Sequence, residues 1–296
     1  MLGVRRLSLV TVSVIAALAV AIPAEAQGNS GNAPGKNKKP KPPSSSALPG
    51  ATSAAAGASP LSTVTGASPL SWLDDASVLE PGSVLLTISG TRWSGAGASE
   101  VYLPVMDLSL GLTKRVQLSA SVPRVAGSAD PSAVAGLGTS YFSAKVALLP
   151  ESTVKLAVSP LLEVLGTGAA QLLPVGESRY QFGLPVSIEA GRGPARLFGA
   201  AGFFTRGAWF AGGGAGFQLK PEMGASVSFT RSWASTDVEG VRRERSEISG
   251  GISYFLTQQI AVYGSLGRTI ATSDENGAGM TVGAGVTFFF VPGASK

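Results

Sequence analysis

The stretch Met280-Thr281-Val282-Gly283-Ala284-Gly285-Val286-Thr287-Phe288 alternates apolar residues with glycine or threonine at every second position. This period of two is that of a β-strand with one apolar face and one face of small or polar residues. Val116-Gln117-Leu118-Ser119-Ala120-Ser121-Val122 shows the same period. Segments of about ten residues with this alternation recur from residue 83 to residue 290, which is typical of a transmembrane β-barrel with one face toward lipid and one toward water.

The spacing of these segments predicts an all-β fold, a transmembrane antiparallel β-barrel of about twelve strands. We place the strands at residues 83–94, 102–112, 115–125, 138–149, 153–165, 178–190, 195–206, 208–219, 223–234, 244–256, 259–271 and 278–290. The connections after the even-numbered strands are short and polar, whereas those after the odd-numbered strands are mostly longer. Tight turns at one rim and loops at the other are the pattern of bacterial outer-membrane barrels, and they place both ends of the barrel on the periplasmic side.

Residues 1–26 have the organisation of an export signal. Arg5-Arg6 are followed by an apolar run from residue 7 to residue 22 and by the small-x-small site Ala24-Glu25-Ala26. The apolar run is shorter than the roughly 20 residues that span a bilayer, so we expect cleavage before Gln27 rather than a membrane helix. We therefore expect export and insertion into the outer membrane of a Gram-negative cell.

Residues 27–81 separate this signal from the barrel, which we place at residues 82–296. They are rich in Ser, Pro, Ala and Gly and contain the basic cluster Lys36-Asn37-Lys38-Lys39-Pro40-Lys41. Such a sequence cannot bury enough apolar surface to offset the cost of ordering, so we predict a disordered N-terminal arm. The basic cluster is either part of a solvated linker or a contact for anionic lipid headgroups or the cell-wall polymer. Trp72-Leu73 and Val78-Leu79 form a candidate short helix that would plug the barrel mouth.

The composition excludes several kinds of chemistry. Cysteine and histidine are both absent from the chain. Their absence removes the thiolate nucleophile, Cys-based metal sites, the usual general base and the partner of a Ser-His-Asp triad. No pair of carboxylates or lysines with supporting context suggests another catalytic site. We therefore expect no enzymatic activity, no cofactor, no bound metal and no nucleic-acid partner.

Strand parity divides the side chains between two faces of the wall. Leu108, Leu118, Phe142, Phe182 and Ile188 fall, with other apolar residues, on the face that should meet lipid. The candidate lumen-lining residues on the opposite face are Asp107, Gln117, Lys145, Lys155, Gln181, Glu189, Phe198, Phe204 and Glu247. The charged members either line a narrow wet pore or pair with one another to hold the interior together. The two phenylalanines would narrow a pore, contact an apolar solute or fill the core, while the many Gly and Ser residues favour open space inside.

The last predicted strand ends in a run of aromatic residues. Val286-Thr287-Phe288-Phe289-Phe290 resembles the aromatic-terminated last strand that the barrel assembly machinery recognises in outer-membrane proteins. Here residues 291–296 follow that run, which departs from the usual pattern. We expect outer-membrane lipid and the barrel assembly machinery to be partners of this chain.

A second resemblance lies in the first half of the predicted barrel. Asp107-Leu108-Ser109-Leu110-Gly111-Leu112-Thr113-Lys114-Arg115-Val116-Gln117-Leu118 opens a strand that ends at Pro123, and Gly136-Leu137-Gly138 then leads into Lys145-Val146-Ala147-Leu148-Leu149-Pro150. These residues resemble the outer-membrane transporter family named for the meta-pathway of phenol degradation. The resemblance implies a channel barrel for small, often aromatic or apolar compounds. Thr139 stands where the family usually has Asp, and Gly166-Thr167-Gly168 replaces its usual Pro-Thr-Gly.

The sequence favours a passive channel or transporter for small solutes, with apolar or aromatic compounds as the class that the resemblance suggests. The alternative is a structural or surface-interaction barrel without transport, which would use its external loops and basic arm. The two hypotheses differ in whether solutes can pass through the barrel interior.

Overall fold

The computed structural model describes residues 75–95, 98–128, 136–150, 152–167, 170, 178–205, 207–234, 244–272 and 278–290. The predicted export signal, the basic cluster of the arm and the last six residues lie outside the described residues. Within the described ranges, no helix is long and apolar enough to cross a membrane.

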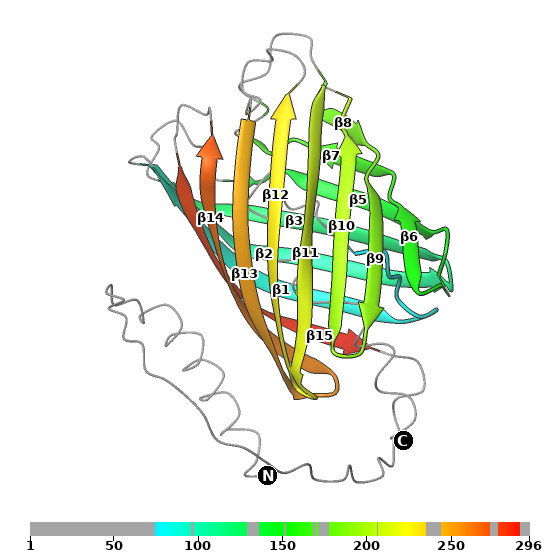
Figure 1. Cartoon of the computed structure of the whole chain (residues 1–296). Helices are drawn as coiled ribbons and strands as arrows, with labels where there is room; N and C mark the ends of the chain where they lie inside the picture. The colour runs from blue at the N-terminus through cyan, green and yellow to red at the C-terminus, as the bar shows by residue number, and fades with distance from the viewer. Residues whose placement is uncertain are drawn as a thin grey trace, which may run out of the picture. The chain divides into compact units, whose positions relative to one another are not determined.

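The described chain is built from β-strands that follow one another around a single sheet (Figure 1). The strands are β1 (Val84–Gly95), β2 (Ala98–Thr113), β3 (Val116–Ser128), β4 (Gly136–Leu137), β5 (Ser140–Ala147), β6 (Val154–Val158), β7 (Leu161–Val164), β8 (Tyr180–Gly183), β9 (Val186–Arg192), β10 (Ala195–Phe203), β11 (Ala208–Lys220), β12 (Met223–Ala234), β13 (Glu244–Thr257), β14 (Ile260–Thr272) and β15 (Gly279–Phe290). Each pairs antiparallel with its neighbours in the sheet.

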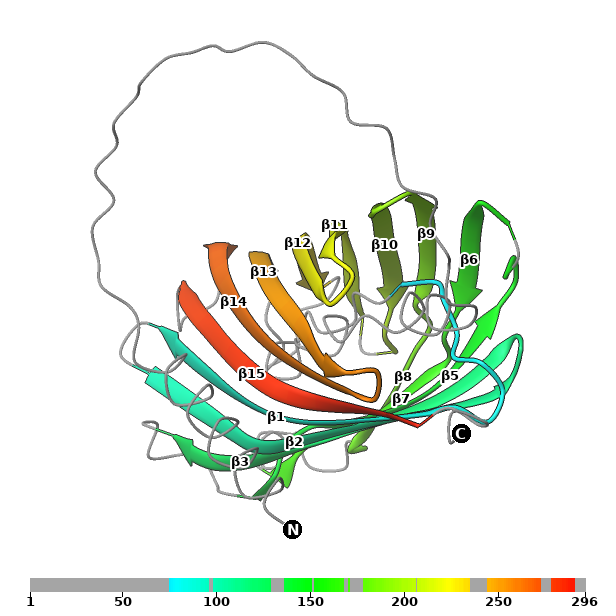
Figure 2. The ribbon, with the colours of Figure 1, turned by 90° about the horizontal axis from the view of Figure 1, so that it is seen from below.

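Three strands of the barrel wall are each interrupted once, so that β4 and β5, β6 and β7, and β8 and β9 form one wall strand per pair. β3 pairs with both β4 and β5, and β5 pairs with both β6 and β7. The barrel therefore has 12 wall strands, which confirms the predicted number. The last strand returns to the first, because β15 pairs with β1 over the whole of β1. Figure 2 shows the strands arranged around a common interior.

Proline explains two of the interruptions. Pro160 stands between β6 and β7, and Pro185 stands between β8 and β9. Proline has no backbone N–H and cannot donate to the hydrogen-bond ladder. The two breaks are adjacent in the wall, because the Ser159 N–H donates to the Pro185 carbonyl at 2.9 Å. The predicted strands at 153–165 and 178–190 are therefore each split into two.

The first hairpin is longer than the sequence predicted. We expected a connection of several residues between strands at 83–94 and 102–112, but β2 begins at Ala98 and pairs with Gly95 of β1. Residues 95–99 are Gly, Ala and Ser, so they carry no apolar alternation that would predict a strand there. At the opposite rim, two residues join β2 to β3, β9 to β10, β11 to β12 and β13 to β14, where the sequence predicted short connections. We call this opposite end the short-turn rim.

Burial in this barrel is the reverse of that in a water-soluble protein. Thr87 and Thr287 are fully buried inside the wall. The residues predicted to meet lipid are exposed, with exposed fractions between 42% and 61% for Leu118, Phe142, Ile188 and Phe182. Large apolar side chains on the outside and small polar ones within are the arrangement of a wall that is surrounded by lipid.

Residues 75–83, which we call the inner segment, run inside the barrel before they enter β1. Asp75, Ser77 and Leu79 are buried, with exposed fractions of 2%, 5% and 6%. The prediction of a disordered arm that reaches residue 81 is therefore wrong for residues 75–81. The predicted plug helix is also wrong over its described part, because residues 75–80 form no helix. Backbone groups of this segment bond to the barrel wall: the Leu79 N–H donates to Gln117, and the Ser77 carbonyl accepts from Lys145.

The end of the inner segment is held by β2. The Gly82 N–H donates to the Gly111 carbonyl at 2.7 Å, and the Gly111 N–H donates to the Ser83 carbonyl at 2.9 Å. The chain passes so close to Gly111 that a Cβ atom there would lie 2.2 Å from the Glu80 carbonyl oxygen. Because Gly111 has no side chain, the inner segment can pass close over β2 at this position.

Candidate channel lumen and its inner segment

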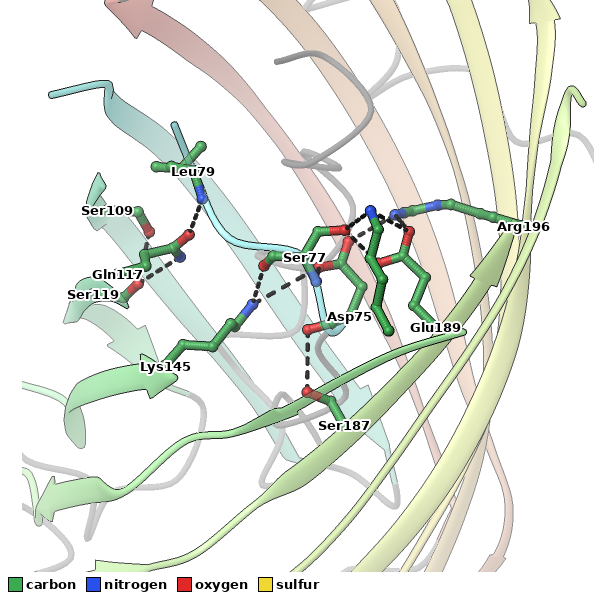
Figure 3. Close-up of polar contacts among 11 residues, drawn as sticks. Asp75, Ser77, Leu79, Ser109, Gln117, Ser119, Lys145, Ser187, Glu189 and Arg196 are labelled. Atoms are coloured by element: carbon green, nitrogen blue, oxygen red, sulfur yellow. Dashed lines mark hydrogen bonds and ion pairs between the residues drawn. The ribbon is translucent and has the colours of Figure 1, made fainter. Parts of the chain in front are cut away.

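The nine candidate lumen residues are buried to different extents. Seven of them are buried, and Lys155 and Phe198 are half-buried. The structure brings Gln117, Lys145, Lys155 and Glu189 together around the inner segment (Figure 3). The others lie elsewhere on the inner face: Glu247 beside Arg245, Phe198 beside Phe204, Gln181 opposite Glu163, and Asp107 opposite Ser121.

Five charged residues form a cluster at the inner segment. The Asp75 carboxylate accepts a hydrogen bond from Arg196 Nη1 at 2.7 Å, and its other oxygen lies 3.8 Å from Lys145 Nζ. Glu189 lies 3.8 Å from Lys155 Nζ and 4.0 Å from Arg196 Nη1. We call these five residues the inner-segment cluster. A hydrogen bond between two charged groups is stronger than one between neutral groups, so this contact fixes Asp75 against the wall.

Ser77 connects the cluster to the backbone of the inner segment. Its hydroxyl donates to Glu189 at 2.6 Å and accepts from Lys155 Nζ at 2.8 Å. Lys145 Nζ donates to the Ser77 carbonyl at 3.2 Å, and Ser187 donates to the Asp75 carbonyl at 3.2 Å. Polar groups of an extended, buried segment need such partners. The wall strands supply them here from β5, β6 and β9.

A second anchor lies further along the inner segment, at Leu79. Its N–H donates to Gln117 Oε1 at 2.9 Å, and Gln117 in turn donates to Ser119 at 3.1 Å. The Leu79 side chain packs in an apolar cluster with Leu85, Ala261 and Phe289. The inner segment is therefore held by charge at one end and by apolar packing at the other.

A different buried charge group lies on β13. Arg245 Nη2 and Glu247 Oε2 are 3.3 Å apart, and both side chains are almost completely buried. The two residues are neighbours on the inner face, because side chains two positions apart on a strand point the same way. The Arg245 guanidinium also lies 5.9 Å from the centre of the Trp93 ring on β1. We call Arg245 and Glu247 the β13 pair.

Aromatic rings cover several glycines of the inner face. Phe204 packs with Phe210 and Ala200, and Phe198 lies against this cluster. A Cβ atom at Gly183 would lie 2.8 Å from the Phe204 ring, and one at Gly214 would lie 2.7 Å from the Phe198 ring. Part of the space that the many glycines leave is therefore filled by aromatic side chains and is not open.

A cavity of about 360 Å³ opens beside the inner-segment cluster at the short-turn rim. Its lining includes Lys155, Glu189 and Arg196, together with Gly193 and Pro194 of the turn between β9 and β10. This cavity gives the cluster a path to the rim. Within the described residues, no group of three or more His, Cys, Asp or Glu side chains is arranged to hold a metal ion.

Two residues of the cluster were missed by sequence reasoning. Arg196 has the same strand parity as Phe198, which was assigned to the interior, so its inward position was readable from that register. Asp75 was assigned to the arm, and no local pattern marks it as a partner of a residue 121 positions away.

No family model and no curated protein matches this chain, so the resemblance to the phenol meta-pathway transporter family remains a prediction. Solved structures match its fold. An outer membrane channel from Pseudomonas putida F1 has a TM-score of 0.56 at 16% sequence identity, over 73% of this chain and 98% of that one. The NanC porin has a TM-score of 0.53 at 12% identity, over 69% and 98% of the two chains. The KdgM porin has a TM-score of 0.51 at 10% identity, over 69% and 99%.

The closed wall of twelve strands, its apolar exterior and its polar interior place this chain among the transmembrane β-barrels, with the fold of outer-membrane porins and channels. The matched structures are named as porins or as a channel.

Proposed function

We propose that this protein is a passive outer-membrane channel for small solutes and that the inner segment forms the narrow part of its passage. The observation that carries the proposal is the inner face of the barrel, where buried Ser, Thr and charged side chains outnumber the buried apolar ones. A polar interior inside an apolar exterior is the arrangement found in water-filled barrels. The fold shared with porins and a channel supports the same function.

The location and the solute belong to the same proposal. The export signal at residues 1–26 and the aromatic-terminated last strand would deliver the chain to the barrel assembly machinery and the outer membrane. The resemblance to the phenol meta-pathway family suggests apolar or aromatic solutes, and Phe198 is half-buried on the inner face where such a solute could touch it. The basic arm would meet lipid headgroups or the cell-wall polymer on the periplasmic side.

One observation favours the alternative, a structural or surface-interaction barrel. The inner segment bonds to the wall through Asp75, Ser77 and Leu79 and occupies part of the interior. If it fills the passage permanently, the barrel transports nothing. The two functions therefore differ in what happens when this segment is removed.

The test is conductance in planar bilayers and solute uptake by liposomes. The mature chain is compared with a variant that lacks residues 27–79 and with a matched control that lacks residues 27–71 and keeps the inner segment. We expect the mature chain and the control to conduct alike, and the variant without the inner segment to conduct several times more. Folding is checked for each by heat-modifiable migration on a gel. Folded proteins that conduct no ions and pass no solute, including the variant without residues 27–79, would defeat the channel and leave the structural barrel.

A further inference from the structure

Asp75 is held by the wall in the way that a bound anion is held. Its carboxylate is only 3% exposed and contacts Arg196 at 2.7 Å and Lys145 at 3.8 Å. Figure 3 shows the two cations approaching it from different strands. The carboxylate belongs to a segment that precedes β1, so none of the hydrogen bonds between wall strands depends on it.

The wall itself carries an excess of positive charge at this point. Lys145, Lys155 and Arg196 supply three cations, and Glu189 is the one wall carboxylate in the inner-segment cluster. Buried charges are costly unless they are paired. Without Asp75, Lys145 and Arg196 would lose the carboxylate that they share. Two of these cations thus contact a carboxylate that belongs to the inner segment and not to the wall.

The site can be reached from the short-turn rim. The cavity of about 360 Å³ is lined by Lys155, Glu189 and Arg196 and lies among the turns. Arg196 retains 18% exposure of its side chain and Lys155 retains 33%. The Arg196 guanidinium lies 5.3 Å from the centre of the Phe198 ring, which helps to hold its orientation. A small molecule that enters this cavity meets two oriented cations beside the Asp75 carboxylate.

We propose that Lys145, Lys155 and Arg196 form a binding site for the carboxylate of a small organic anion, and that Asp75 occupies this site as a tethered substitute until such an anion displaces it. The proposal deepens the proposed channel function, on which it rests, by naming a carboxylate as the group that the passage recognises. Displacement of Asp75 releases the inner segment from the wall at its charged end. Binding of the solute carboxylate would therefore also move the inner segment and widen the passage.

The tether determines how tightly a free carboxylate binds. A group on the same chain competes at an effective concentration in roughly the millimolar range. Free carboxylates must outcompete it, so they bind weakly to the wild-type protein. Removal of the Asp75 carboxylate removes this competitor and leaves the cations in place.

Benzoate and benzamide are suitable probes, because they share a shape and differ in charge. Binding to the purified, folded protein is measured by titration calorimetry in detergent. We expect Asp75→Ala to bind benzoate at least about tenfold more tightly than the wild type, in line with the loss of a tethered competitor. Benzamide should bind no better to the variant than to the wild type. The double variant Asp75→Ala/Arg196→Gln should lose the gain.

The matched control is Glu163→Gln, which removes a buried inner-face carboxylate from β7, outside the cluster. It should bind benzoate as the wild type does. Equal benzoate binding by the wild type and Asp75→Ala, or an equal gain in Glu163→Gln, would overturn the proposal. A gain that persists in the double variant would do the same, because the site would then lie elsewhere.

A measurement on the unaltered chain covers the case in which a variant does not fold. Saturating benzoate should speed hydrogen exchange at the backbone amides of residues 76–80 several-fold, whereas benzamide should not. Unchanged exchange with bound benzoate would overturn the displacement. The calorimetry does not depend on conduction, so benzoate binding without conductance would remove the channel function and leave the site, while conductance without this binding would do the reverse.

Discussion

The barrel interior holds two buried charge groups that are built in different ways. In the β13 pair, both partners come from one wall strand, and their side chains are 3.3 Å apart and almost fully buried. In the inner-segment cluster, the cations come from the wall but Asp75 comes from a segment that precedes the first strand. The first group lies within one strand, so its two side chains stay neighbours as long as β13 keeps its place in the wall. The second can break while every wall strand stays paired, which makes it suited to control of the passage.

The largest expected difference between the two groups is in stability. Arg245→Met should lower the free energy of unfolding by about 3–5 kcal/mol, because it leaves a buried carboxylate without its arginine. Arg196→Met should cost about 1–2 kcal/mol, because its side chain borders a cavity and Asp75 keeps its lysine. Reversible unfolding in urea, followed by tryptophan fluorescence in micelles, measures both. Equal losses would mean that the two groups are not built differently.

The comparison also assumes that lipid covers the outside of the wall, which the next variant tests. Leu266 lies at the centre of β14 and is 49% exposed, whereas Leu256 lies near the end of β13 and is 47% exposed. Leu266→Arg should cost about 2–4 kcal/mol and Leu256→Arg about 0–1 kcal/mol, because the cost of an arginine falls toward the interface. Unfolding in phospholipid vesicles gives both values. A cost that does not depend on position would contradict a lipid-facing exterior.

A smaller effect should appear where the inner segment crosses β2. Gly111→Ala should cost about 1–3 kcal/mol, because the added Cβ meets the Glu80 carbonyl oxygen and forces the chain to move. Gly127→Ala is the control, since nothing lies within 4 Å of a Cβ atom at that position. Limited proteolysis should cut residues 75–83 faster in the Gly111 variant. If cleavage is unchanged, the crossing point is not what holds the inner segment.

The smallest expected effect belongs to a neutral pair of the wall. The hydroxyls of Thr87 and Thr287 are 3.0 Å apart across the β1–β15 seam, and both residues are fully buried. Thr87→Val should cost about 1 kcal/mol, because it leaves the other hydroxyl without this partner. The double variant with Thr287→Val should cost less than the sum of the single changes. Strict additivity would show that the pair contributes nothing to closing the barrel.

The sequence by itself determined the wall. The period of two is a local property of each strand, so Leu118 and Phe182 could be assigned to the outside and Lys145 and Glu189 to the inside before any partner was known. The number of wall strands follows from the same repeats and from the turns between them. Pro160 and Pro185 could also have predicted the two strand breaks, but the predicted strands at 153–165 and 178–190 included these prolines.

Only the tertiary structure decided how the interior is used. The contacts of the inner segment join residues that lie 38 positions apart for Leu79 and Gln117, and 121 positions apart for Asp75 and Arg196. No local sequence pattern predicts contacts between residues so far apart along the chain. Residues 75–80 were assigned to a disordered arm because their partners lie not in the arm but on the inner wall. Their order comes from the contacts that Lys145, Glu189 and Arg196 of the wall make with Asp75 and Ser77.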